Sequence, residues 1–331
     1  MSLTVTFKDV GHGDSILIEW DSTRKHIGVI DCNKLGASNP VLDYISINNF
    51  KEIDFLVLSH PHLDHYSGFG DLLKYCQTNG VIINKFCFTI LSQYTAIIQS
   101  NESLHDFIEF AKLLESIDAC FRKKVILDIV ELDSTTKDFI LTKNIKIETL
   151  APSYQDKKSL IDTNKKKQPH KKLSKAVDFN KVATFFKLSI TDKRQYILFT
   201  SDVTRGVIKT IMSKKKVDSA EKILLGQVPH HGSKLNHAPQ FWTSLNKDEN
   251  SIAVFSCGQS PIHSLPDEPV VSDFKKFKYE IHSTNSVNGI LNLVSSTLKG
   301  ASHLLDFVST YGGTASISAT SNLVGDQKFT F

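Results

Sequence analysis

The chain has 331 residues, 40% of them apolar, and a formal net charge of +4, which predicts a globular protein with a sizeable core. No run approaches the roughly 18 apolar residues of a membrane-spanning helix, and the N-terminus lacks the basic and apolar regions of a signal peptide. Five dispersed cysteines without a C-x-x-C pair exclude a disulfide framework or a zinc finger, and indicate reduced thiols in the cytoplasm.

Apolar patterning predicts short strands at residues 3–7, 15–20, 27–30 and 55–58. Helical spacing follows at 69–76 and 104–121. Later strands are expected at 145–147, 182–190, 196–200, 223–228 and 252–256, with one helix starting just after residue 202. Strands that come first, helices that alternate with later strands, and a second group of strands predict an α/β sandwich of two sheets rather than a barrel.

A lysine-rich segment at about residues 156–175 interrupts this pattern. It contains eight lysines and shows no periodicity of a helix or strand, so it is predicted to be an inserted mobile loop. One interpretation is a solvated surface loop. The other is an arm that attracts a polyanion such as a nucleic acid, because clustered lysines raise the affinity for phosphates. The segment has no aromatic residues on which unpaired bases could stack.

The heptad Ser-His-Pro-His-Leu-Asp-His at residues 59–65 is the strongest chemical signal in the chain. It supplies four potential ligands in six positions: His60, His62, Asp64 and His65. Imidazoles with one carboxylate suit zinc, or manganese as an alternative. His60 and His62 are two residues apart, so they point to the same side of an extended segment. Asp64 and His65 follow where a helix can begin. This spacing predicts two ions rather than a histidine-rich surface loop or a helix cap.

Four further segments carry polar residues where a site for two metal ions would need them. Asp31 follows an apolar strand and is interpreted as a turn residue or as an acceptor that fixes a ligand histidine. Asp202 either caps the following helix or bridges both ions with its two oxygens. His230 and His231 offer one ligand and one neighbour that contacts substrate. His263 lies near prolines and is either a loop residue or part of the site.

The order of these clusters resembles the metallo-β-lactamase superfamily, and most closely the stand-alone hydrolase domain of the competence-protein ComEC family. Residues 60–65 contain the H-x-H-x-D-H hallmark unchanged, and residues 10–18 resemble the V-G-x-G-D-S opening with Asp14. Thr200-Ser-Asp202 is similar to the T-G-D motif, and residues 230–234 match H-H-G-S-K. The resemblance implies a four-layer αββα sandwich of two mixed β-sheets flanked by helices. It implies one metallo-hydrolase domain over residues 1–331, with the lysine-rich insertion and a C-terminal extension at about 293–331.

The resemblance also implies the ligands. One ion is expected on His60, His62 and Asp202, and the other on Asp64, His65, Asp202 and one of His230 and His231. Catalytic roles are expected for Asp64, His231 and Lys234. Support of the ligands or contact with substrate is expected for His12, Asp14, Asp31, Ser233 and His263.

Two residues depart from the ComEC pattern, and a further histidine carried by many superfamily members is missing, as it typically is in ComEC-like domains. Ser201 replaces the glycine of T-G-D, and His12 stands where the family usually has glutamine. No histidine ends a strand between the heptad and Asp202; His105 lies in a predicted helix and His170 in the lysine segment. The ion on His60 and His62 is therefore expected to be one protein ligand short.

The expected function is metal-dependent hydrolysis in which a hydroxide that bridges the metal ions attacks the substrate. The protein is expected to be a phosphodiesterase or nuclease that acts on DNA, RNA or a nucleotide. One alternative is hydrolysis of a small ester, thioester or lactam, because the superfamily uses the same ligands for all of these. Another is a non-catalytic regulatory member that binds polyanions. The complete heptad argues against a non-catalytic role.

Overall fold

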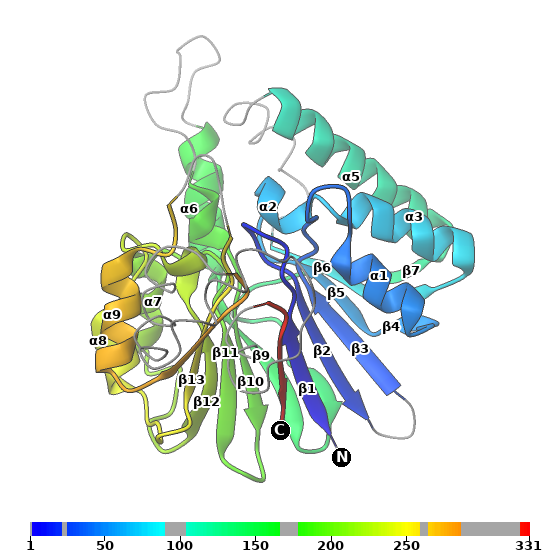
Figure 1. Cartoon of the computed structure of the whole chain (residues 1–331). Coiled ribbons are helices and arrows are strands. Elements are labelled where there is room, and N and C mark those ends of the chain that lie inside the picture. The colour runs from blue at the N-terminus through cyan, green and yellow to red at the C-terminus, as the bar shows by residue number, and fades with distance from the viewer. Residues whose placement is uncertain (1, 22–24, 90–103, 166–177, 259–263, 286–324) are drawn as a thin grey trace, which may run out of the picture.

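The computed structural model describes residues 2–21, 25–89, 104–165, 178–258, 264–285 and 325–331 (Figure 1). His263 and His170 lie outside these residues, as do residues 166–175 of the lysine-rich segment and most of the C-terminal extension. The described chain forms two mixed β-sheets that pack face to face, with helices on the outer side of each sheet (Figure 1). The predicted α/β sandwich of two mixed sheets flanked by helices is confirmed.

The first sheet has eight strands in the order β15-β1-β2-β3-β5-β6-β4, and β7 also pairs with β6. Their bounds are β1 Leu3–Phe7, β2 Ile16–Asp21, β3 Lys25–Ile30, β4 Glu52–Ile53, β5 Phe55–Leu58, β6 Ile82–Phe88, β7 Ile126–Glu131 and β15 Gln327–Thr330. The strands β15, β1, β2 and β3 pair antiparallel in this order, whereas β3, β5 and β6 are parallel. The C-terminal extension therefore adds one strand beside β1.

The second sheet has seven strands in the order β14-β13-β12-β11-β10-β9-β8. Their bounds are β8 Phe139–Thr142, β9 Ile145–Ala151, β10 Phe185–Ile190, β11 Gln195–Phe199, β12 Lys222–Gln227, β13 Ile252–Phe255 and β14 Glu280–Ser283. Strands β8 to β11 are antiparallel and β11 to β14 are parallel. The C-terminal ends of β11, β12 and β13 therefore meet at one edge.

Three apolar cores separate four layers. Alternate side chains of the two sheets, such as Phe7 and Phe199, face each other in the central core. Helices α1 (Pro40–Ile47), α3 (Phe69–Asn79) and α5 (Leu104–Arg122) cover the first sheet. Helices α7 (Arg205–Ser213), α8 (Pro239–Ser244) and α9 (Glu268–Lys276) cover the second (Figure 1). Among the described residues, no helix is long and apolar enough to cross a membrane.

The prediction that residues 156–175 form a loop is wrong for the first half of the segment. Residues 156–165 belong to helix α6 (Tyr154–Lys165). Ser153 and Asp156 exchange hydrogen bonds at its start, and Leu160 is buried in the core. The Lys157 ammonium lies 2.8 Å from Glu131 and 2.9 Å from Asp133, so this lysine is paired rather than free for a polyanion. These tertiary contacts stabilise a helix whose own sequence has little helical signal.

Candidate metal centre

The heptad lies at the end of β5, where the strand leaves the sheet. His60 lies two residues after the last residue of β5 and is fully buried. His62 is extended and precedes helix α2 (Leu63–Tyr66), which carries Asp64 and the fully buried His65. Nε2 of His60 lies 2.9 Å from Nδ1 of His62. The structure therefore brings all four heptad side chains to one edge of the sandwich.

Asp202 joins two halves of this cluster. His65 and His231 lie beside one of its oxygens, and His60 and His230 lie beside the other. Oδ1 lies 3.5 Å from Nε2 of His65 and 3.5 Å from Nε2 of His231. Oδ2 lies 3.7 Å from Nε2 of His60 and 3.7 Å from Nε2 of His230. The capping interpretation of Asp202 is wrong, because Thr204 accepts the hydrogen bond at the start of α7. This carboxylate is placed to contact two ions.

A buried carboxylate and a serine orient one histidine of each half. Asp31 follows β3, and its Oδ2 accepts from Nδ1 of His65 at 2.7 Å and from Oγ of Ser59 at 2.6 Å. Since the Ser59 hydroxyl donates to Asp31, it accepts from Nδ1 of His60, 3.0 Å away. Both histidines thus carry a proton on Nδ1 and present Nε2 toward Asp202. Ser201 adds a hydrogen bond of 2.8 Å to the same serine hydroxyl.

His231 is oriented by Ser256, the residue that follows the neighbouring strand β13. Its Nδ1 donates to the carbonyl oxygen of Ser256 at 2.8 Å, and its Nε2 lies 3.4 Å from Oδ2 of Asp64. Asp14 lies beside this ring and accepts a hydrogen bond of 2.8 Å from Gln227. The carbonyl of the same glutamine side chain accepts from the backbone at residues 200 and 201. Gln227 therefore connects the N-terminal turn to the end of β11.

The electrostatics of the cluster suit a bound cation. Burial and the nearby His65 and His62 lower the pKa of His60 well below its usual value, which favours a neutral imidazole. Burial alone would raise the pKa of Asp202, but the charges of His231 and the other histidines outweigh it and hold the carboxylate ionised. Burial opposes the charged form of His231, yet Asp202 and Asp64 raise its pKa to about 9. Without an ion, protons on histidines balance the carboxylates; a divalent cation can replace those protons.

Buried atoms without hydrogen-bond partners test the fit to metal ions. They include Oδ1 of Asp14, Nε2 of His65, Oδ1 of Asp202 and Nε2 of His231. Such groups are costly to bury unless something binds them. Among the described residues, ligand atoms lie mutually within 4.8 Å in the sets His12/Asp64/His231, His60/His65/Asp202, Asp14/Asp202/His231 and Asp14/Asp31/His65. The donor set of imidazoles and carboxylates fits a divalent metal ion.

The two halves of the cluster differ in compactness. His62 and His230 belong to none of the compact sets found among the described residues. His230 also keeps 27% of its side chain exposed, whereas that of His231 is 1% exposed. The half around Asp64 and His65 is therefore the more preorganised one.

The remaining predicted site residues lie at different depths. Nε2 of His12 lies 3.4 Å from Oδ2 of Asp64, and its ring is 4.5 Å from that of His231, so His12 belongs to the cluster itself. The Lys234 side chain is 67% exposed, and its ammonium lies 3.5 Å from Asp267. The hydroxyl of Ser233 accepts a hydrogen bond from the backbone of residue 235. His105 is exposed on α5.

Backbone strain is concentrated at the centre. Asp31, Ser201, His230 and His231 all have positive φ values, of 61°, 43°, 49° and 54°. Such conformations are unfavourable for residues with a β-carbon and persist where surrounding contacts hold them. Ser201 thus has a left-handed backbone, the conformation that glycine adopts most readily.

Several residues that hold the ligands were not identified from the sequence. Ser59, Gln227 and Asn180 orient His60, Asp14 and His230. Ser59 precedes the first ligand directly, which is a weak signal. Gln227 ends β12, but nothing in the sequence indicates its partner 213 residues away.

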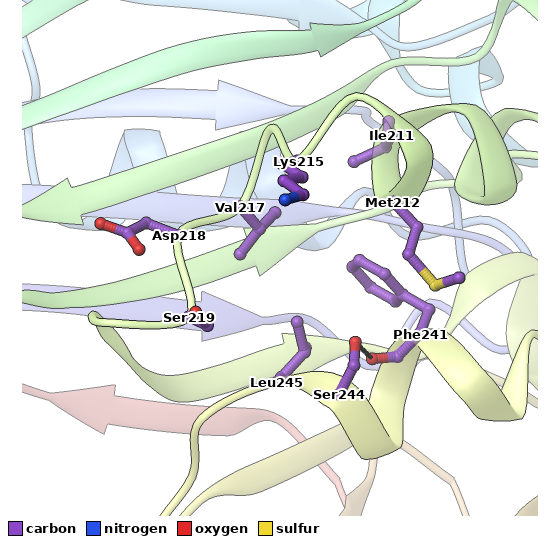
Figure 2. A pocket seen from close by; sticks show the side chains of 9 residues that line it. All are labelled: Ile211, Met212, Lys215, Val217, Asp218, Ser219, Phe241, Ser244 and Leu245. Atoms are coloured by element: carbon purple, nitrogen blue, oxygen red, sulfur yellow. Dashed lines mark hydrogen bonds between the residues drawn. The ribbon is translucent and has the colours of Figure 1, made fainter.

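A separate pocket lies between α7 and α8 (Figure 2). It is lined by Ile211, Met212, Lys215, Val217, Asp218, Ser219, Phe241, Ser244 and Leu245. This lining contains one carboxylate and neither histidine nor cysteine. The pocket is therefore not part of the metal centre.

No family model matches the chain, and no curated protein matches it. Among solved structures, the metallo-beta-lactamase fold protein YhfI from Bacillus subtilis is 11% identical, with 86% of this chain and 98% of that chain covered and a TM-score of 0.44. A diphosphatase from the PhnP family is also 11% identical, with 86% and 85% covered and a TM-score of 0.35. Likenesses this distant do not indicate a substrate.

Proposed function

We propose that this chain is a metal-dependent hydrolase of the metallo-β-lactamase superfamily that cleaves phosphodiesters in a nucleic acid or nucleotide. The observation that supports this proposal is the position of Asp202, one oxygen of which lies near His65 and His231 and the other near His60 and His230. Two divalent ions, when bound, supply an acidified water and neutralise negative charge on the leaving oxygen. Zinc is the first choice and manganese the second, because the donors are imidazoles and carboxylates.

The chain's own residues would then position the reaction. Asp31 and Ser59 fix the tautomers of His65 and His60, so that both present Nε2. The carbonyl of Ser256 does the same for His231. His12 lies beside Asp64 with 15% of its side chain exposed. We assign to it the donation of a proton to an oxygen of the substrate.

A basic pocket supports an anionic substrate. It is lined by Arg205, Lys209, Pro239, Gln240, Pro269, Val270 and Asp273, with Lys234 and His237. Arg205 lies three residues after Asp202, and Lys234 three residues after His231, so both follow ligand segments directly. The pocket thus gathers Arg205, Lys209 and Lys234 on segments that follow the proposed ligands in sequence, while His237 is paired with Asp273 in its lining. We assign the phosphates of a longer substrate to these cations.

A substrate panel tests this function. Protein loaded with Zn²⁺ or Mn²⁺ is assayed on single-stranded DNA, duplex DNA, RNA, bis-p-nitrophenyl phosphate and a carboxyl ester. We expect cleavage of phosphodiesters that chelation abolishes and that His62→Ala and Asp64→Ala eliminate while the fold is retained. Cleavage of the carboxyl ester alone would replace the phosphodiesterase with an esterase. Binding of DNA without any cleavage would indicate a regulatory polyanion-binding protein.

A further inference from the structure

The adjacent histidines of the 3-10 turn η2 (Pro229–Gly232) face different halves of the cluster. Left-handed backbone at both residues turns the two rings to 79° from each other, with centroids 5.8 Å apart. Nε2 of His231 lies near Oδ1 of Asp202 and near Asp64. Nε2 of His230 lies 3.7 Å from Oδ2 of Asp202, the same oxygen that faces His60. One turn thus presents an imidazole to each side of a single carboxylate.

We propose that both histidines are ligands of different ions: His231 of the ion on Asp64 and His65, and His230 of the ion on His60 and His62. His230 then supplies a third imidazole for that ion, since no histidine ends a strand between the heptad and Asp202 in the part of the chain that the structure describes. This inference rests on the proposed function only in assuming a two-ion centre. It does not depend on the substrate.

The two distances to Asp202 are close to those of tetrahedral coordination, whereas His60 and His62 are joined by a hydrogen bond. With metal–ligand bonds of about 2.0–2.1 Å, neighbouring ligand atoms are about 3.3–3.5 Å apart. Nε2 of His60 and Nε2 of His230 each lie 3.7 Å from Oδ2 of Asp202, and Nε2 of His60 is 2.9 Å from Nδ1 of His62. His62 and His230 are both partly exposed, and binding of one ion requires their rings to turn, because neither belongs to a compact set of ligand atoms among the described residues.

Asn180 supplies the contact that sets the tautomer of His230. It lies in the 3-10 turn η1 (Phe179–Val182), is 7% exposed, and its side-chain amide lies 3.0 Å from Nδ1 of His230. Its buried Oδ1 has no hydrogen-bond partner. The oxygen and nitrogen of an amide occupy equivalent positions, so turning the group over lets Oδ1 accept a proton from Nδ1. Nε2 is then free to bind an ion, as in other metal sites where a polar neighbour orients the histidine.

Metal binding to the full chain tests the proposal without any substrate. Apo protein is titrated with Zn²⁺ by calorimetry and with Co²⁺ by visible absorption, which reports the number and kind of ligands. We expect two ions in the wild type. His230→Ala and His62→Ala should each weaken the same ion, and their combination should be little worse than His62→Ala alone, because both act on one site. His231→Ala should weaken the other ion.

Asn180 provides the matched pair of variants. Asn180→Asp can only accept from Nδ1 and should keep both ions, whereas Asn180→Leu should lower the affinity for the His60/His62 ion by about 10- to 100-fold. The proposal would be overturned if His230→Ala bound both ions with the affinities of the wild type. It would also be overturned if Asn180→Asp and Asn180→Leu lowered the affinity for the His60/His62 ion equally. If the ions divide as stated but no substrate of the panel is cleaved, the hydrolase function fails and the ligand assignment stands.

Discussion

Oδ2 of Asp31 lies 2.7 Å from Nδ1 of His65 and, through the hydroxyl of Ser59, is linked to Nδ1 of His60. One buried carboxylate therefore holds a histidine of each half of the metal centre. Its 61° φ angle keeps the carboxylate at the end of β3, facing the end of the parallel strand β5. Neither histidine can turn without breaking this chain of hydrogen bonds.

Replacement of this acceptor should weaken both ions. We expect Asp31→Asn to lower metal affinity by about 10- to 100-fold, the usual cost of removing a group that orients a ligand histidine. Ser59→Ala should affect the His60 ion more than the His65 ion, because His65 keeps its direct bond to Asp31. Titration of apo variants with Zn²⁺ measures both effects. Unchanged affinities in Asp31→Asn would contradict this role.

The clustering of the proposed ligands could be predicted from the sequence because they follow strands. Parallel strands end at the same edge of a sheet, so Asp31 is expected close to His60, and Asp202 close to His231. The capping role considered for Asp202 is wrong because Thr204, two residues later, caps α7. Helix α1 was missed although Asn39 and the following proline are a normal helix start.

The supporting contacts could not be predicted, because they join distant segments. Asn180 reaches His230 across 50 residues, and Gln227 reaches Asp14 across 213. Helix α6 was also missed, since its stability comes from Lys157 and Leu160 rather than from a helical pattern in the sequence. Tertiary packing outweighs local propensity in such segments.

Gly13 permits the turn between β1 and β2 to pack on the heptad at residues 59–65. Its φ is +130°, and a β-carbon there would lie 2.2 Å from the carbonyl oxygen of Asp64. We expect Gly13→Ala to displace Asp64, to weaken the Asp64/His65 ion, and to destabilise the fold by about 1–3 kcal/mol. Gly36→Ala is the control, because Gly36 also has positive φ but nothing within 4 Å of the added carbon. Zn²⁺ titration and chemical denaturation should separate the two variants.

The lysines of the segment 156–175 should divide into two groups. Lys157 is paired with Glu131 and Asp133, so Lys157→Ala should destabilise the protein by about 1–3 kcal/mol and leave the salt dependence of DNA binding unchanged. Joint replacement of Lys165, Lys166 and Lys167 by alanine should reduce the slope of log affinity against log salt by about 0.9 for each phosphate that the variant no longer neutralises. Equal slopes in the triple variant and the wild type would remove the polyanion role of this segment.

Metal loading should stabilise the fold, because the buried Nε2 atoms of His65 and His231 and Oδ1 of Asp202 lack partners without an ion. An ion that binds only the folded state adds about 2.7 kcal/mol at 100 times its dissociation constant. We therefore expect Tm to rise with Zn²⁺ concentration and to fall on chelation. Asp202→Ala should abolish this rise, whereas His105→Ala should preserve it, because His105 is exposed on α5. A Tm insensitive to Zn²⁺ in the wild type would show that these atoms do not hold an ion, and the hydrolase proposal would then fail with them.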